Sequence, residues 1–276
     1  MPQALTHMTA TSSPNAVSVE RHTPALRILG VRIDDVTSAE TCERVMALMA
    51  GGGAHQIATV NPEFIMAAQR NPAFAQVLDK TALNVPDGAG VLWAARRMGS
   101  PLRERVAGVD LVECLCATGS QHRWRAFFLG AREGVAERAA AIMAFKYSGL
   151  LVTGTHAGSP RLEDEAEIVA RVRKARPNLL FVAYGAPAQD LWLARNLPVI
   201  HGFERPSDES PGLVGMGVGG AFDFLAGAQR RAPKWMQEAG LEWLYRLLRQ
   251  PRRWRRQLAL VQFAWRVAWA SARAKR

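Results

Sequence analysis

Hydrophobic positions fall into two kinds of pattern that alternate along the chain. Short apolar runs bounded by Gly, Pro or Asn predict strands at residues 26–33, 55–60, 82–85, 125–129, 150–155, 178–183, 198–201 and 214–218. Stretches with apolar residues three and four apart predict helices at residues 38–49, 63–70, 91–98, 109–117, 135–147, 163–175 and 187–195. Because strands that alternate with helices are typical of βαβ units, the pattern predicts an α/β fold around a mostly parallel sheet.

The two ends of the chain depart from this pattern. Residues 1–24 are rich in Thr, Ser and Pro and are predicted to be disordered. Residues 25–229 form the predicted α/β domain. Residues 230–276 are predicted to form a helical appendage of two helices that is broken at Gln250-Pro251. One apolar face of the second helix consists of Trp254, Leu258, Val261, Trp265 and Trp269.

Charge is distributed unevenly between the domain and the appendage. The 276 residues are 49% hydrophobic and 21% charged, an ordinary globular balance, with a formal net charge of +11. Residues 230–276 hold 13 of the 35 Lys and Arg residues but only 2 of the 24 Asp and Glu residues, so the appendage accounts for the whole excess. A localised basic segment predicts an anionic partner, which could be a phosphate, a nucleic acid or an anionic membrane surface.

The cysteines and the apolar segments indicate the cellular compartment in which the protein is expected. Cys42, Cys114 and Cys116 lack the number and spacing of a disulfide framework or a metal site, and they are interpreted as buried thiols in a reducing compartment. No stretch reaches the roughly 18 uninterrupted apolar residues of a transmembrane helix, and no signal-peptide pattern opens the chain. We therefore expect a cytoplasmic protein that is peripheral on the inner face of the plasma membrane.

Polar and glycine residues follow several of the predicted strands. They are Thr59, Asn61, Asp87, Gly88, Gly130, Gly185, Pro187, Gln189, Asp190 and Gly219. In a parallel α/β sheet, ligands bind beyond the carboxyl ends of the strands, and glycines let backbone N–H groups approach a phosphate. Strand-to-helix turns use Gly, Asn and Asp in any case, so each position alone is a weak signal. Together they predict a nucleotide or another phosphate ligand.

Asp87 is the carboxylate that we single out as a candidate general base. It stands in a Pro-Asp-Gly turn after an apolar strand, where it could equally cap the next helix. Asp223, between two phenylalanines, is the rival base, although a buried structural carboxylate is the favoured interpretation there. Thr59 and Asn61 either hydrogen-bond a sugar or phosphate or simply cap the helix that follows them.

The appendage combines arginine with tryptophan. Its arginines include Arg230, Arg231, Arg246, Arg249, Arg252, Arg253, Arg255 and Arg256. A solvated charged face and a nucleic-acid patch are the alternatives to a membrane contact. We favour an anionic membrane surface, with no nucleic acid, because Trp and Arg together suit the lipid headgroup region and an apolar face would have no purpose in a groove binder. If that face packs on another subunit instead, the protein is a homo-oligomer.

Eight stretches of the chain carry a family resemblance. They are TVNPE at 59–63, PDGAGV at 86–91, RVAGVDL at 105–111, FFLG at 127–130, GAPAQD at 185–190, GVGGAFDFLAG at 217–227, RAPKW at 231–235 and GLEWLYRL at 240–247. In this order they resemble the WecG/TagA/CpsF family of bacterial glycosyltransferases. The resemblance runs from roughly residue 26 to residue 256 and is highly specific.

The resemblance implies an inverting, metal-independent hexosyltransferase, without a cofactor, on a Rossmann-like domain with a helical appendage. It would move a hexose or N-acetylhexosamine from a UDP-sugar donor to a polyprenyl-diphosphate-linked saccharide, in exopolysaccharide or cell-wall polymer synthesis. Asp87 would be the base, with Thr59 and Asn61 in the same pocket. Substrate would be bound by Gly88, Gly130, Gly185, Pro187, Gln189, Asp190, Gly219 and Asp223. The diphosphate and the membrane would be contacted by Arg231, Arg246, Arg253 and Arg256.

Two positions depart from the family pattern, since Asp190 stands in place of Glu and Ala188 where Lys is common. The donor sugar is therefore open between N-acetylmannosamine, glucose and other hexoses, and the acceptor sugar is open as well. We expect the appendage to close over the site at the membrane and exclude water. The alternatives are a nucleotide-dependent oxidoreductase, which lacks a dinucleotide fingerprint here, and a non-enzymatic basic protein that binds membrane or nucleic acid.

Overall fold

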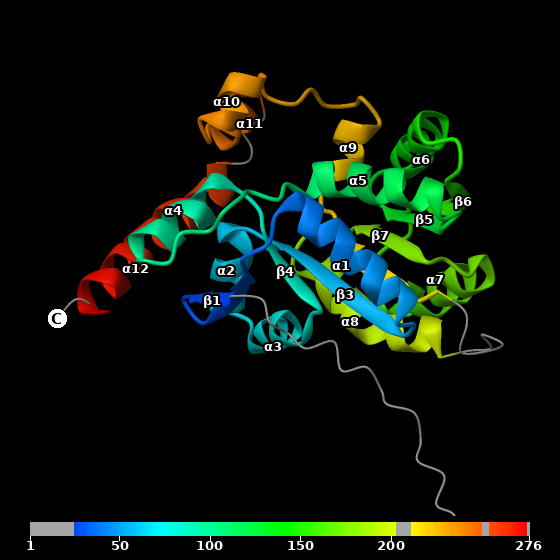
Figure 1. Ribbon diagram of the computed structural model, residues 1–276, viewed down its shortest axis with the longest axis horizontal. Coiled ribbons are helices and arrows are strands. Elements are labelled where there is room, and N and C mark those ends of the chain that lie inside the picture. The colour runs from blue at the N-terminus through cyan, green and yellow to red at the C-terminus, as the bar shows by residue number, and fades with distance from the viewer. Residues whose placement is uncertain (1–24, 203–210, 250–253, 275–276) are drawn as a thin grey trace, which may run out of the picture.

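The computed structural model describes residues 25–202, 211–249 and 254–274 (Figure 1). The strands of its main sheet are β3 (Ala54–Val60), β4 (Leu83–Pro86), β5 (Arg125–Gly130), β6 (Leu151–His156), β7 (Leu179–Ala183) and β8 (Leu213–Gly217). All six are parallel, in the order β4-β3-β8-β7-β5-β6. The predicted α/β class with a parallel, Rossmann-like sheet is confirmed.

Helices follow most of these strands. They are α1 (Ser38–Ala50), α2 (Pro62–Ala68), α3 (Pro72–Lys80), α4 (Ala89–Arg97), α5 (Gly108–Gln121), α6 (Val135–Lys146), α7 (Leu162–Ala175), α8 (Ala188–His201) and α9 (Ala221–Leu225), with α10 (Lys234–Glu238), α11 (Glu242–Arg249) and α12 (Trp254–Ala274) in the appendage. Two of them begin at an Asn-Pro pair. Asn61 and Asn71 each accept a hydrogen bond from the third following backbone N–H, and proline takes the first helical position.

Helices cover both faces of the sheet. α1, α5, α6 and α9 pack on one face, around a core that includes Leu115, Phe128 and Phe222. α7 and α8 cover the other face, where Phe127 and Trp192 are buried. Neighbouring residues Phe127 and Phe128 enter different cores because successive strand residues point to opposite faces. A third core joins α2, α3, α4 and α12 beside β4.

The predicted strand at residues 26–33 is wrong as a single element. It is a two-stranded antiparallel hairpin of β1 (Ala25–Ile28) and β2 (Val31–Asp34), separate from the main sheet. The turn residues Leu29 and Gly30 both have positive φ angles, 47° and 85°. Two consecutive positive φ angles match the right-handed twist of a tight hairpin, so the chain reverses in the middle of the apolar run.

The predicted strand at residues 198–201 is also wrong, because these residues form the last turn of α8. Pro198 lies inside the helix. The buried positions Trp192, Leu193, Asn196, Leu197 and Ile200 keep the helical spacing across it. Burial of this face therefore outweighs the tendency of proline to end a helix.

The interpretation of the cysteines as three buried thiols needs correction. Cys42 of α1 and Cys114 of α5 form a disulfide, with Cα atoms 6.8 Å apart. The two helices pack side by side on one face of the sheet, which brings together residues 72 positions apart in sequence. Cys116 is a buried free thiol as predicted, and burial raises its pKa to about 12.

The appendage lies at the β4 end of the molecule (Figure 1). α10 and α11 are short helices that pack on each other, and α12 runs along α2 and α4. In Figure 1, α12 and α6 lie at opposite ends of the long axis. The predicted disorder at residues 1–24 and the predicted break at Gln250-Pro251 fall outside the described residues.

Candidate active site

The carboxyl ends of β3 and β4 bring the first predicted site residues together. The strands pair with Val60 opposite Pro86, and the backbone N–H of Asp87 donates to Val60 O over 2.9 Å. Asp87 therefore lies beside Asn61, the residue that follows Val60. The loop before α5 is tied to the same point, because Val106 N–H donates to Pro86 O over 2.8 Å.

Thr59 lies one residue earlier and is buried between β8 and the start of α5. Its Oγ1 donates to Gly217 O at 3.4 Å. A Cβ atom on Gly108 would stand 3.4 Å from Thr59 Cγ2, so α5 begins directly against this side chain. β3 and β8 are neighbours, yet the helices that follow them pack on opposite faces of the sheet. That reversal makes the crevice in which open α/β sheets bind ligands.

The starts of α2 and α4 show how Asn61 and Asp87 relate to the helices that follow them. Asn61 Oδ1 accepts from Phe64 N–H at 3.1 Å, so its oxygen caps α2 and the NH₂ group is left for other partners. Asp87 directly precedes the N-cap position of α4, which is Gly88, with φ of 92°. The capping alternative is therefore confirmed for Asn61, whereas capping and base catalysis by Asp87 both stay predictions.

Gln189 holds two glycine loops at the next strand ends. Its Oε1 accepts from Gly185 N–H at 3.0 Å and from Gly219 N–H at 2.9 Å, and the residue is only 1% exposed. Both glycines have positive φ angles, and a Cβ atom on either would meet nothing within 4 Å. The backbone at these glycines therefore faces open space, while Gln189 sets their separation from beneath.

Asp190 is fully buried next to Gln189. A Cβ atom on Gly217 would stand 2.9 Å from its Oδ1, so the carboxylate packs against bare backbone. Neither oxygen makes a hydrogen bond of good geometry among the described residues. Burial raises the pKa of Asp190 to about 7, and the nearby Gln189 and Gln56 amides offset this only in part. Asp190 thus lies behind the loop and not on an open surface.

Two further predicted residues stand farther along the sheet. Gly130, at the end of β5, is four strand spacings from β4, or about 19 Å. A Cβ atom there would stand 2.8 Å from the carbonyl carbon of Ala183, so this glycine permits close strand packing. Asp223 is ion-paired with Arg132 at 3.2 Å and its side chain is 20% exposed, which fits the structural interpretation. Pro187 is the N-cap residue of α8.

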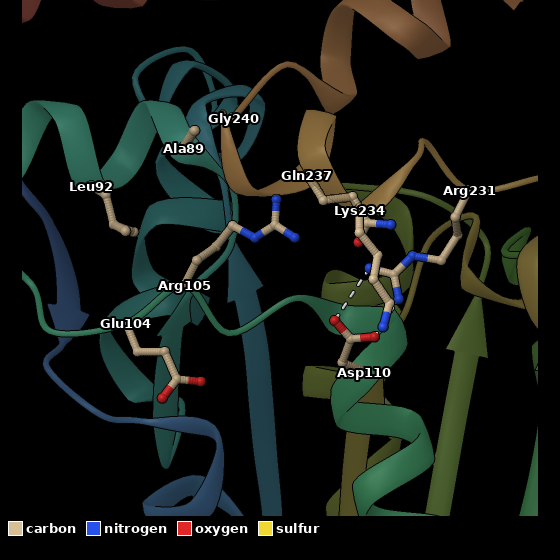
Figure 2. A pocket seen from close by; sticks show the side chains of 9 residues that line it. All are labelled: Ala89, Leu92, Glu104, Arg105, Asp110, Arg231, Lys234, Gln237 and Gly240. Carbon is tan, nitrogen blue, oxygen red and sulfur yellow. Dashed lines mark hydrogen bonds and ion pairs between the residues drawn. The ribbon is translucent and has the colours of Figure 1, made fainter.

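A pocket of about 620 Å³ opens between the start of α4 and the appendage (Figure 2). Its lining residues are Ala89, Leu92, Glu104, Arg105, Asp110, Arg231, Lys234, Gln237 and Gly240. Thr59, Asn61 and Asp87 are not among them, although Ala89 is only two residues beyond Asp87. The candidate base and the pocket are therefore adjacent rather than coincident.

Three cationic side chains enter this pocket from the loop before α5 and from the appendage (Figure 2). Arg231 is paired with both carboxylate oxygens of Asp110. Arg105 is ion-paired with Glu242 at 3.4 Å, and both side chains are mostly buried. Lys234 makes no ion pair among the described residues. Cations gathered this way suit a phosphate or diphosphate.

Most of the pocket's charged residues were absent from the predicted site. Only Arg231 was included, while Glu104, Arg105, Asp110 and Lys234 were not. A signal was present for Arg105, Asp110 and Lys234, because these three lie inside stretches that carry the family resemblance, at 105–111 and 231–235. These residues come together only through contacts between positions far apart in the sequence, such as Arg231 and Asp110, which are 121 residues apart.

The remaining predicted arginines are only partly placed. Arg246 belongs to α11 and Arg256 to α12, but their side chains lie outside the described part of the structure, as does Arg253 altogether. No helix in the described ranges is long and apolar enough to cross a membrane. Within those ranges, no group of three or more His, Cys, Asp or Glu side chains is arranged to hold a metal ion.

Comparisons with known proteins identify the family of this chain. The family model for the glycosyl transferase WecG/TagA/CpsF family matches residues 26–276. A protein of Bacillus spizizenii, named N-acetylglucosaminyldiphosphoundecaprenol N-acetyl-beta-D-mannosaminyltransferase, is 33% identical over 207 residues, covering 75% of this chain and 76% of that protein. A protein of the same name from Staphylococcus aureus strain MW2 is 30% identical over 263 residues, covering 94% and 98%. The chain belongs to the WecG/TagA/CpsF family of glycosyltransferases.

Proposed function

We propose that this chain is an inverting N-acetylhexosaminyltransferase that moves a sugar from a UDP-sugar to N-acetylglucosamine on undecaprenyl diphosphate. One observation carries the proposal: the pairing of β3 with β4 puts Asp87 beside Asn61, next to a pocket with three cationic side chains. The sugar and the lipid acceptor are those in the names of the relatives. UDP is the donor nucleotide that the family resemblance implies.

In the proposed reaction Asp87 is the general base. It takes the proton of the acceptor hydroxyl as that oxygen attacks the anomeric carbon of the donor. The bond from the anomeric carbon to the UDP oxygen breaks, UDP leaves with the electron pair, and the configuration at the anomeric carbon inverts. The N-terminus of α8, which follows Gly185, stabilises the charge of the departing diphosphate, without a metal ion or a cofactor.

The two substrates would approach Asp87 from opposite sides. The backbone at Gly185 and Gly219 follows β7 and β8 and faces open space, which leaves room for the nucleotide diphosphate of the donor, while the N–H groups of these glycines donate to Gln189. The cationic pocket lies between the starts of α4 and α5 and the appendage, and α10 forms part of its wall. We therefore assign the pocket to the diphosphate of the lipid-linked acceptor, whose lipid chain then lies toward the appendage.

Lys234→Gln is expected to raise the apparent KM for the lipid-linked acceptor about tenfold, because one charge-assisted phosphate contact is lost. Steady-state kinetics at saturating donor measure it. The matched control is Lys80→Gln on α3, an exposed lysine away from the pocket. Equal KM values for the two variants would contradict the assignment of the pocket.

The outer face of α12 is proposed to contact an anionic membrane surface on the cytoplasmic side. Leu258, Val261, Trp265 and Trp269 are 50%, 69%, 68% and 51% exposed, so the predicted apolar face points away from the core. The two tryptophan rings stack, and the guanidinium of Arg273 lies 3.5 Å from the Trp269 ring centroid. Exposed tryptophan next to arginine is typical of helices that lie in the headgroup region.

Trp265→Ser combined with Trp269→Ser is expected to weaken binding to phosphatidylglycerol vesicles about tenfold or more, since two interfacial anchors are removed. Vesicle co-sedimentation measures the loss. The control is Phe145→Ser on α6, which removes an aromatic side chain that is 92% exposed at the other end of the molecule. Unchanged vesicle binding would contradict the membrane contact. Loss of an oligomer in sedimentation velocity would assign this face to a second copy of the chain.

The proposed function is tested by UDP release from a panel of UDP-sugars, with synthetic undecaprenyl-diphosphate N-acetylglucosamine as acceptor. UDP-N-acetylmannosamine is expected to give acceptor-dependent release, and UDP-glucose much less. Release that is equally fast without acceptor would indicate hydrolysis in place of transfer. Absence of release with every donor would overturn the proposal and favour a non-enzymatic membrane-binding role.

A further inference from the structure

α12 carries a second apolar face, opposite to its exposed one. Phe263 is 2% exposed and Val267 is fully buried, in the core that also contains residues of α2 and α4. Residues at positions 263 and 267 are one helical turn apart, so they share the inner side of the helix. This face joins α12 to the two helices that follow Asn61 and Asp87.

Phe263 reaches the point where those two helices begin. A Cβ atom on Gly90 would stand 2.7 Å from Pro62 Cγ and 3.9 Å from Phe263 Cε1. Pro62 directly follows Asn61, and Gly90 is the third residue after Asp87. The Phe263 ring therefore packs where the first turn of α4 meets the first turn of α2.

The appendage contacts the same turn of α4 a second time. A Cβ atom on Gly240, between α10 and α11, would stand 2.7 Å from Ala89 Cβ. Ala89 and Gly90 are consecutive, so residues on both sides of α11 pack against the turn that follows Asp87. The N-cap residue of α4 is Gly88, which has no side chain to cap the helix, so packing against this turn adds to its restraint.

We propose that Phe263 is a positioning residue for sugar transfer, which fixes Asp87 relative to Asn61 by packing against Gly90 and Pro62. The inference rests on the proposed function. Backbone pairing between β3 and β4 holds Asp87 from the sheet side, and Phe263 holds the turn after it from the opposite side. Val261 and Trp265, two residues away on either side, are on the exposed face, so the helix proposed to bind membrane is also the one that supports the base.

Phe263→Ala is expected to lower kcat for transfer about 10- to 100-fold with little change in KM for the UDP-sugar, because a small misplacement of a catalytic group slows the chemical step. Phe263→Leu should restore most of kcat by refilling the space. The control is Val267→Ala, which removes an equally buried side chain one turn farther from Gly90. Equal kcat losses in the two alanine variants would overturn the inference.

Hydrogen exchange of the full chain gives a readout that does not depend on activity. In Phe263→Ala, the amides of Asp87 to Val91 are expected to exchange about tenfold faster than in Val267→Ala, with β5 and β7 unchanged in both. Equal exchange of these amides in the two variants would contradict the positioning role even if neither transferred sugar. If the wild-type chain transfers no sugar, the proposed function fails, and the exchange comparison still decides whether Phe263 restrains the Asp87 turn.

Discussion

Asp87→Asn is expected to lower kcat for sugar transfer about 10³-fold, because an amide cannot take the proton of the acceptor hydroxyl. The Kd for UDP should stay within a factor of three, because asparagine keeps the size of the side chain. Asp87 follows the carboxyl end of β4 and directly precedes Gly88, the N-cap residue of α4. Single-turnover transfer to the lipid-linked acceptor measures the rate, and calorimetric titration with UDP measures binding.

Asp223→Asn is the matched control for this experiment. Asp223 pairs with Arg132 at the surface of α9, so its loss should cost transfer much less than the loss of Asp87. If Asp223→Asn abolished transfer and Asp87→Asn left it intact, the base would have to be reassigned to Asp223. Loss of UDP binding in Asp87→Asn would instead indicate a structural role for Asp87.

Asp190→Asn is expected to stabilise the fold at pH 8 and to have much less effect at pH 5. Burial raises the pKa of Asp190 to about 7, from the ordinary aspartate value of 3.8. Between these values the folded chain binds a proton that the unfolded chain releases, so wild-type stability falls as pH rises from about 4 to about 7. Above pH 7 the buried carboxylate is ionised and lowers the free energy of unfolding of the wild-type chain by the full amount, on the order of 4 kcal/mol.

The measurement is urea unfolding of both proteins at pH 5 and pH 8. The stability gain from Asp190→Asn should be about 3 kcal/mol larger at pH 8, since asparagine does not titrate. The control is Glu163→Gln, which neutralises an exposed carboxylate on α7 and should shift stability equally at both pH values. A gain that is independent of pH for Asp190→Asn would contradict a buried carboxyl group whose pKa is raised to about 7.

The sheet and the residues at its carboxyl edge could be predicted from the sequence. The six central strands were each bounded by turn residues, and parallel strands necessarily align their carboxyl ends. The proximity of Thr59, Asn61 and Asp87 follows from that alignment and is confirmed by the pairing of β3 with β4. Their roles in catalysis stay predictions, which the Asp87 experiment tests.

Features that depend on long-range packing could not be predicted from the sequence pattern. Gln189 reads as a polar loop residue that could contact a ligand, but its side chain is buried and holds Gly185 and Gly219. Asp190 shows no sign of burial in a segment with several polar and small neighbours. The pocket beside α4 is formed by residues of the domain and of the appendage, so no local stretch contains it.

In α12, the apolar pattern of the exposed face is easier to recognise in the sequence than that of the buried face. Tryptophans on its outer face dominate the periodicity, and that face is exposed. Among the α12 side chains that the structure describes, the fully buried large apolar ones are Phe263 and Val267, which belong to the core shared with α2 and α4. In the same way, one apolar run at residues 26–33 concealed the turn of a hairpin, because nothing but a single glycine marked it.

Transfer of N-acetylmannosamine from its α-linked UDP donor to undecaprenyl-diphosphate N-acetylglucosamine is the most direct test of the central claim. Mass spectrometry would identify the lipid-linked product, and the anomeric signals in its NMR spectrum would give the linkage. The account predicts a β-linked disaccharide that forms with the wild-type chain and is nearly absent with Asp87→Asn. An α-linked product would contradict inversion, and no lipid-linked product with any UDP-sugar would contradict the transferase itself.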